Sequence, residues 1–209
     1  MPEMDNKPYK TIAHGAAAEY VEKRSRFIAT VSPVDDDDRA REFVAAIKKK
    51  YPDARHNVYA YLTLDGMTRY SDDGEPKGTA GLPVLGVLQK QELYGVAVVV
   101  TRYFGGVLLG AAGLLRAYTK AAADGIEAAG VVTVRPYSRI NVNVSFSDAE
   151  RVRYELSKHS LPEYDVDYSE SVTFRLLVPE EKTDHLIARL TELTAGKANI
   201  IRAGTEMRA

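Results

Sequence analysis

The 209-residue sequence predicts a two-domain protein of the α/β (α+β) class. Hydrophobic periodicity predicts strands and helices that are mixed along the first half of the chain. From Val131 onward the predicted order is β-α-β-β-α-β, which is that of a ferredoxin-like split βαβ unit. Hydrophobic residues make up 45% of the chain, enough for two small cores. The boundary is predicted near Arg135-Pro136, which gives domains 1–135 and 136–209.

In the first domain, alternating polar and apolar residues predict an early strand over Arg26–Val31. The acidic run Asp35–Asp38 suits the start of the next helix, where backbone N–H groups are unpaired. The apolar run Gly95–Tyr103 predicts a strand that is buried on both faces at the centre of a sheet. The other predicted elements are a helix containing Ala40 to Tyr51, hairpin strands at 57–64 and 67–71 around Asp65-Gly66, a short helix from about Pro83 to Lys90, and a long helix ending near Gly130.

In the second domain, Ser147 and Glu150 have the spacing of a capping box and predict the start of a helix. The predicted elements are strand 132–146, helix 148–159, strands 163–168 and 171–178, helix 180–193 and strand 199–207. The last helix carries an apolar face, so this half is expected to fold around a core of its own.

Composition excludes several classes of function. The 28 basic and 29 acidic residues give a net charge of -1, so no global field attracts nucleic acid or an anionic membrane. The absence of cysteine excludes disulfides, thiolate zinc sites and cysteine nucleophiles. Met1–Lys10 lacks the apolar core of a signal peptide, and Val96–Val100 is too short to cross a bilayer. We therefore expect a cytoplasmic protein with no membrane partner.

Three segments carry a specific pattern: 54–61 (ARHNVYAY), 71–83 (SDDGEPKGTAGLP) and 101–118 (TRYFGGVLLGAAGLLRAY). Their order and spacing resemble the N-terminal domain of the IMPACT family, and the second half is similar to the C-terminal domain of its bacterial YigZ branch. Two positions depart from the family: Val58, where cysteine is frequent, and Ala112, where a second glycine is frequent. The residues that match the family motifs are His56, Tyr59, Asp72, Asp73, Glu75, Pro76, Gly78, Tyr103, Gly105, Gly106, Gly110 and Gly113.

The resemblance implies a first domain of the type found in a ribosomal protein and in domain IV of elongation factor G. It also implies a ferredoxin-like second domain similar to other elongation-factor domains. The implied function is a regulatory protein linked to translation, which binds the ribosome, RNA or DNA without catalysis and without a cofactor. Two alternatives remain at this point: a metal-dependent hydrolase or phosphotransfer enzyme, and a module that binds only a protein partner.

The acidic loop Ser71–Lys77 and the glycine-rich segment 105–113 are the two candidate ligand-binding segments. Carboxylates of Asp72, Asp73 and Glu75 could hold a divalent cation, although their spacing is not that of an EF-hand and a structural role is favoured. Glycines before a helix could expose N–H groups to a phosphate, or could simply allow close packing.

Five cations are candidates for phosphate contacts: Arg24, Arg26, Arg102, Arg116 and Lys120. Arg24 and Arg26 are predicted to point the same way from one strand, beside aromatic residues, although ordinary solvated charge is favoured there. For the other three, the alternative is pairing with Asp124 or with the acidic loop.

His56 is the remaining titratable candidate, because its ring could carry a proton or bind a ligand. A hydrogen-bonded structural role is favoured. No histidine metal site is predicted, because His14, His159 and His185 share no ligand spacing. No catalytic residue is predicted.

Overall fold

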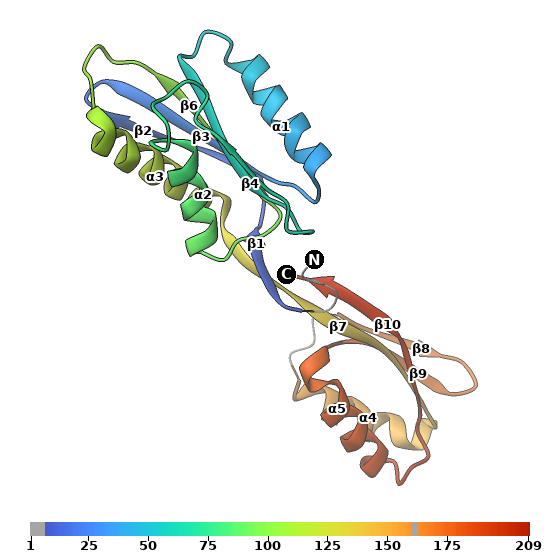
Figure 1. The fold of residues 1–209 in the computed structure, drawn as a ribbon. Helices are drawn as coiled ribbons and strands as arrows, with labels where there is room; N and C mark the ends of the chain where they lie inside the picture. Colours follow the sequence, from blue (N-terminus) through green and yellow to red (C-terminus); the bar gives the residue numbers. More distant parts are fainter. Residues whose placement is uncertain (1–6, 160–162) are drawn as a thin grey trace. The chain divides into compact units, whose positions relative to one another are not determined.

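The structure is a computed structural model that describes residues 7–159 and 163–209. It is an α+β protein with two antiparallel sheets (Figure 1). The chain forms two compact units, of which the first reaches Val134 and the second spans Arg135–Arg208. In the described part of the chain, no helix is both long enough and apolar enough to span a membrane.

The first unit contains a five-stranded sheet with the order β2-β3-β6-β4-β5. Strand β1 lies outside this sheet and pairs with the first four residues of β7. The elements are β1 (Tyr9–Ile12), β2 (Ala16–Glu22), β3 (Ser25–Pro33), α1 (Asp37–Lys50), β4 (His56–Leu62), β5 (Thr68–Ser71), α2 (Gly81–Lys90), β6 (Val96–Tyr103), α3 (Gly110–Ala129) and the first four residues of β7 (Val131–Val144).

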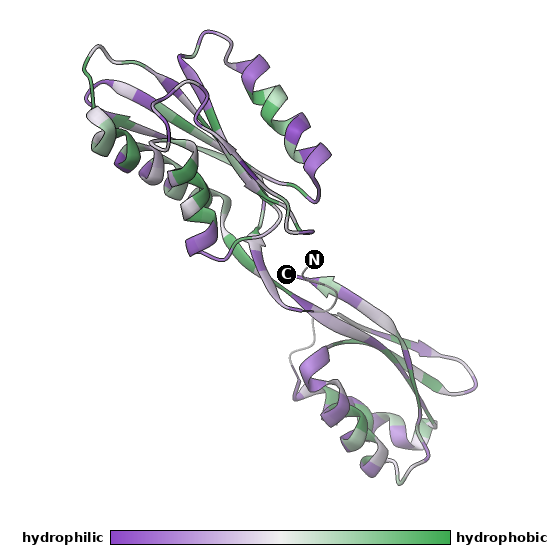
Figure 2. Ribbon diagram, in the orientation of Figure 1, coloured by the Kyte–Doolittle hydropathy of each residue, from purple (hydrophilic) through white to green (hydrophobic). Residues whose placement is uncertain are grey.

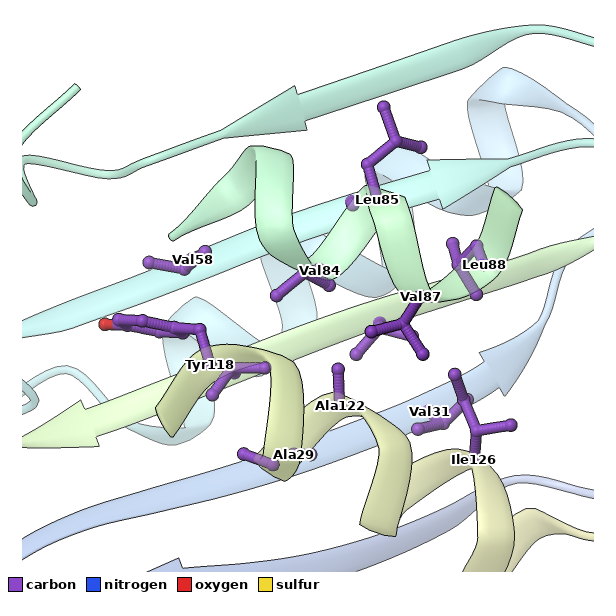
Figure 3. Packing of buried hydrophobic residues seen from close by; sticks show 14 of the residues in the cluster. Ala29, Val31, Val58, Val84, Leu85, Val87, Leu88, Tyr118, Ala122 and Ile126 are labelled. Atoms are coloured by element: carbon purple, nitrogen blue, oxygen red, sulfur yellow. The ribbon is translucent and has the colours of Figure 1, made fainter. Parts of the chain in front are cut away.

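Strand β6 is the centre of this sheet, as the sequence predicts, because helices cover both faces. Helices α2 and α3 pack on one face and α1 packs on the other (Figure 1). Val98 and Val100 of β6 join the core under α2 and α3, whereas Ala97 and Val99 join the clusters under α1. Figure 3 shows side chains of α2, α3 and β3 interdigitating in the larger core.

Helix α1 begins and ends as its charges predict. The side chain of Asp36 caps it by accepting a hydrogen bond from the backbone N–H of Arg39 at 2.8 Å. Asp37 and Asp38 lie in the first turn and three lysines lie in the last turn, so both ends complement the helix dipole. Figure 2 shows this helix as hydrophilic at both ends with apolar residues in its middle, and its buried residues are Ala40, Val44 and Ile47.

The second unit follows the predicted order β-α-β-β-α-β. After β7 come α4 (Phe146–Ser157), β8 (Glu163–Tyr168), β9 (Val172–Pro179), α5 (Glu180–Leu193) and β10 (Asn199–Arg208). The strands form an antiparallel sheet with the order β10-β7-β9-β8, and the two helices cover one face (Figure 1). The core includes Ile140, Phe174 and Leu190, all fully buried.

The predicted capping box at Ser147 is wrong. Helix α4 begins at Phe146 with Ser145 as its N-cap, so Ser147 lies inside the first turn. The hydroxyl of Ser145 donates to the carboxylate of Asp148 at 2.9 Å and does not cap the backbone. The helix starts earlier because β7 ends at Val144, and the extended residue Ser145 makes the whole transition.

Candidate functional site

The three motif segments meet at a cleft of about 650 Å³ beside the end of β6. This volume lies within the range of about 300–1,000 Å³ that is typical of small-molecule sites. Segment 54–61, the acidic loop and segment 101–118 each contribute to the walls. The cleft is lined by Arg55, His56, Gly74, Glu75, Pro76, Arg102, Phe104, Leu108, Leu109, Gly110, Ala111 and Leu114.

The floor of the cleft holds a buried ion pair between Glu75 and Arg102. Their closest atoms, Oε1 and Nη1, are 2.5 Å apart, and the side chains are only 3% and 6% exposed. The hydroxyl of Tyr118 donates to the same Oε1 at 2.8 Å. Burial, with the nearby Glu75 charge, raises the pKa of Tyr118 far above its usual value, so the hydroxyl keeps its proton. Arg102 therefore pairs with the acidic loop, which is the alternative to a free phosphate ligand.

The ring of His56 is held between the acidic loop and the ion pair. Its Nδ1 lies 2.7 Å from the carbonyl oxygen of Asp73, which can only accept a hydrogen bond, so Nδ1 carries a proton. Its Nε2 lies 3.8 Å from Oε1 of Glu75. These contacts agree with the structural, hydrogen-bonded role for His56.

Asp73 ties the loop to α1 and β4. Its carboxylate accepts from Nζ of Lys48 at 2.6 Å and from the backbone N–H of Asn57 at 2.7 Å. Burial alone would raise the pKa of Asp73, but these two hydrogen bonds outweigh it and hold the pKa below its ordinary value.

The carboxylate of Asp72 caps the N-terminus of α2, whereas that of Asp73 binds Lys48 and Asn57. One oxygen accepts from the N–H groups of Ala80 at 3.1 Å and Gly81 at 2.8 Å, and the other accepts from Gly78 at 2.9 Å. The carbonyl of Pro76 accepts from the N–H of Thr79 at 3.1 Å and so turns the loop toward the helix. The three carboxylates of the loop thus point at separate partners. Within residues 7–159 and 163–209, no group of three potential ligands could hold a metal ion.

We expect the stabilising effect of Asp73 to disappear in acid. Because its folded-state pKa is lowered, the effect is present above the unfolded value of about 3.9 and is lost as the pH falls through the folded pKa. Asp73→Asn should therefore destabilise the protein at neutral pH, and the difference from wild type should shrink below about pH 4. Urea denaturation across a pH series measures this difference. A difference that does not depend on pH would contradict the assignment.

Of the other candidate cations, some form ion pairs with acidic side chains of the described residues and some do not. Lys120 pairs with Asp124 at 2.5 Å, which is the alternative that its spacing allowed. Arg26 forms two hydrogen bonds of 2.9 Å with Glu19 and lies over the ring of Tyr103. Arg116 is exposed and forms no ion pair with any of the described residues.

The expectation that Arg24 and Arg26 point the same way from one strand is wrong. Strand β2 ends at Glu22 and β3 begins at Ser25, so Arg24 lies in the turn with a left-handed backbone (φ 68°). Alternation of faces applies only inside a strand. Arg24 is exposed, and its backbone packs against Gly105.

The glycines of segment 105–113 have different roles. A Cβ on Gly105 would lie 2.0 Å from the carbonyl carbon of Arg24, so close packing of two backbones requires glycine here. Gly106 and Gly110 have left-handed backbones (φ 84° and 69°), and a Cβ on either would meet nothing. A Cβ on Gly113 would touch only the Leu109 side chain, at 3.0 Å.

The two tyrosines of the family motifs lie outside the cleft lining. Tyr59 stacks on Tyr61 with ring centroids 6.1 Å apart, and the Tyr103 hydroxyl donates to Asp53 at 3.0 Å. Conversely, Arg55, Phe104 and Leu108 line the cleft but are not among the residues that the sequence pattern singles out. The sequence signal for them is that large apolar residues stand beside glycines in segment 101–118. In the structure Phe104 is 48% exposed and Leu108 is 83% exposed.

Comparison with known proteins matches both halves of the chain. The Impact N-terminal domain matches residues 23–126, and the Domain of unknown function (DUF1949) matches residues 142–197. A crystal structure of a hypothetical protein aligns with a TM-score of 0.59 at 26% identity, covering 95% of this chain and 98% of that one.

Two bacterial relatives align over most of their length, whereas a mammalian relative aligns over about a third of its length. IMPACT family member YvyE of Bacillus subtilis is 39% identical over 194 residues, which is 92% of this chain and 89% of that protein. An IMPACT family member of Thermus thermophilus is 36% identical, covering 84% of this chain and 96% of that protein. Protein IMPACT of Rattus norvegicus is 35% identical over 114 residues, covering 52% of this chain and 35% of that protein. The chain belongs to the IMPACT family.

Proposed function

We propose that the protein is a non-catalytic regulatory protein linked to translation, which binds RNA through its first unit. The observation that carries this proposal is the cleft beside the end of β6. It places the exposed cation Arg55 in the same lining as the half-exposed ring of Phe104, whereas the charge of Arg102 is compensated by Glu75. Proteins that bind single-stranded nucleic acid combine cations for the phosphates with aromatic rings for the bases.

The fold adds support by analogy. The strand order β10-β7-β9-β8 with two helices on one face is that of a ferredoxin-like domain. The family resemblance implies that this domain is similar to domains of elongation factors and that the first unit is similar to domain IV of elongation factor G. A fold hosts many functions, so this likeness adds less weight than the cleft.

The two alternative functions have weaker support. A metal-dependent hydrolase would need free carboxylates, but those of Asp72, Asp73 and Glu75 are each bound to residues of the chain. A module that binds only protein would use the exposed apolar side chains of Val107 and Leu108. It would leave the exposed cation Arg55 of the same cleft without a role.

The test is a salt series of binding to ribosomes, single-stranded RNA, double-stranded RNA and DNA. We expect affinity for RNA to fall steeply with salt, with a slope of about 0.7 per phosphate contact for single strands. Arg55→Ala should reduce that slope by about 0.7, the share of one contact, and Arg116→Ala measures how far the contact surface extends along α3. Arg39→Ala is the matched control, because Arg39 is an exposed cation on α1, on the opposite face of the sheet.

Absence of salt-sensitive binding at low salt would overturn the proposal. An equal effect of Arg39→Ala and Arg55→Ala would show diffuse attraction instead of a site. A partner that survives nuclease treatment in a pull-down, without any RNA affinity, would support the protein-binding alternative.

A further inference from the structure

The N-terminus of α3 opens into the cleft. Leu109, Gly110 and Ala111 line the cleft and form the start of this 20-residue helix. The N-cap residue Leu109 makes no capping hydrogen bond through its side chain, and the first turn contains no acidic residue. The first N–H groups of a helix lack partners within it and carry a partial positive charge, so this end is suited to an anion. The left-handed Gly106 and Gly110 leave the neighbouring backbone uncovered by a Cβ.

A second, independent observation comes from Arg102 in the same cleft. Arg102 is 5% exposed, and its guanidinium lies over the rings of Phe27 and Phe104, 5.4 Å and 5.7 Å from their centroids. Its Nε is buried and has no hydrogen-bond partner among residues 7–159 and 163–209. Its Nη1 donates to Glu75 and so fixes the side chain, while the N–H group of Nε remains without an acceptor among the described residues. A buried donor without a partner costs about 1–3 kcal/mol, and an acceptor atom supplied by a ligand would remove this cost.

The charges of the cleft favour an anion over a cation. The charge of Glu75 is compensated by Arg102, and its Oε1 also accepts from Tyr118. Arg55 then remains as an exposed positive charge at the wall, in addition to the helix terminus. The lining also contains apolar side chains, among them the half-exposed ring of Phe104, Leu108 and Leu114.

We propose that this cleft holds one nucleotide, with its phosphate at the N-terminus of α3 and its base against Phe104. This inference rests on the proposed function and narrows it from a surface that follows RNA to a pocket for a single nucleoside phosphate. A free nucleoside monophosphate and the terminal nucleotide of an RNA present the same chemistry. Stacking of a base on an aromatic ring contributes about 1–3 kcal/mol, and the uncapped helix contributes the phosphate site.

The test uses two variants that differ only in charge, Ala111→Asp and Ala111→Asn. Ala111 is exposed and lies in the first turn of α3, where an acidic residue favours the helix, so neither variant should unfold the protein. Isothermal calorimetry at low salt measures binding of nucleoside 5′-monophosphates, unphosphorylated nucleosides and inorganic phosphate. We expect the monophosphates to bind more tightly than the other two classes. Ala111→Asp should weaken them at least about tenfold by charge repulsion, while Ala111→Asn should stay within about threefold of wild type.

Phe104→Ala tests the base side of the cleft. It should weaken the monophosphates by about tenfold and leave inorganic phosphate unchanged. The inference is overturned if nucleosides bind as tightly as monophosphates, if only inorganic phosphate binds, or if the aspartate and asparagine variants bind alike.

Short single-stranded RNAs with and without a terminal phosphate show whether the ligand is an RNA end or a free nucleotide. They also test the nucleotide pocket separately from the proposed RNA binding. Dependence of RNA binding on a terminal phosphate would identify the RNA end as the occupant, whereas tight binding of free monophosphates alone would identify the small molecule. Salt-sensitive RNA binding that Ala111→Asp does not alter would overturn the pocket and leave the proposed function standing. If the wild-type protein binds neither RNA nor nucleotides, both proposals are overturned.

Discussion

Glu75→Ala is expected to lower the free energy of unfolding of the first unit by about 3–5 kcal/mol. The substitution leaves Arg102 buried without its carboxylate and removes the acceptor of the Tyr118 hydroxyl. A buried charge that loses its partner cannot recover hydration, because Arg102 is only 5% exposed. Chemical denaturation followed by circular dichroism measures the loss. Hydrogen exchange at the amides of β6 assigns the transition to the first unit.

Two controls separate the buried pair from ordinary charge. Glu19→Ala removes the partner of Arg26, but that pair is about half exposed, and little change in stability is expected. The double variant Glu75→Leu with Arg102→Met replaces both charges by apolar side chains and should recover much of the loss. An effect of Glu75→Ala no larger than that of Glu19→Ala would contradict the buried-pair assignment.

Most elements of the fold could be predicted because their periodicity is strong. Strand β6 begins with five consecutive apolar residues, Val96 to Val100, and α1 carries its charges at the expected ends. The misses occur where local signals are ambiguous. Two nearby serines could both cap α4, and the tight turn at Lys23-Arg24 uses left-handed backbones (φ 46° and 68°) without the glycine or asparagine that normally mark such a turn.

The candidate site was predictable as a set of residues but not as a set of partners. His56, Glu75 and Arg102 stand out in the motifs, yet the ion pair joins positions 27 residues apart. The antiparallel register of β4 and β6 places His56 opposite Arg102, and no periodicity in either strand fixes that register alone. The wall residues Arg55 and Phe104 were missed because nothing in their spacing shows that the chain turns back there around a cleft.

Gly105→Ala is expected to lower the free energy of unfolding by about 3 kcal/mol or more, although it adds a single methyl group. The new Cβ would lie 2.0 Å from the carbonyl carbon of Arg24 and 2.3 Å from its oxygen. These are backbone atoms, so no side-chain rotation can relieve the clash, and the hydrogen bond of 3.1 Å from Gly105 N–H to the Ser25 hydroxyl would be strained as well. Thermal and urea denaturation measure the loss.

The controls for Gly105→Ala are two other glycines with open space around them. Gly86 lies exposed inside α2, and a Cβ added there would meet nothing within 4 Å, so Gly86→Ala should stabilise the protein by about 0.5–1 kcal/mol. Gly106→Ala should cost about 1 kcal/mol, from its left-handed backbone alone. If Gly105→Ala lowers the free energy of unfolding no more than Gly106→Ala does, the two backbones are not in close contact.

A larger loss of stability in Gly105→Ala would show that the turn at Arg24 fixes the position of the chain next to Phe104. Nucleotide binding should then weaken in the variant even under conditions in which the fold persists.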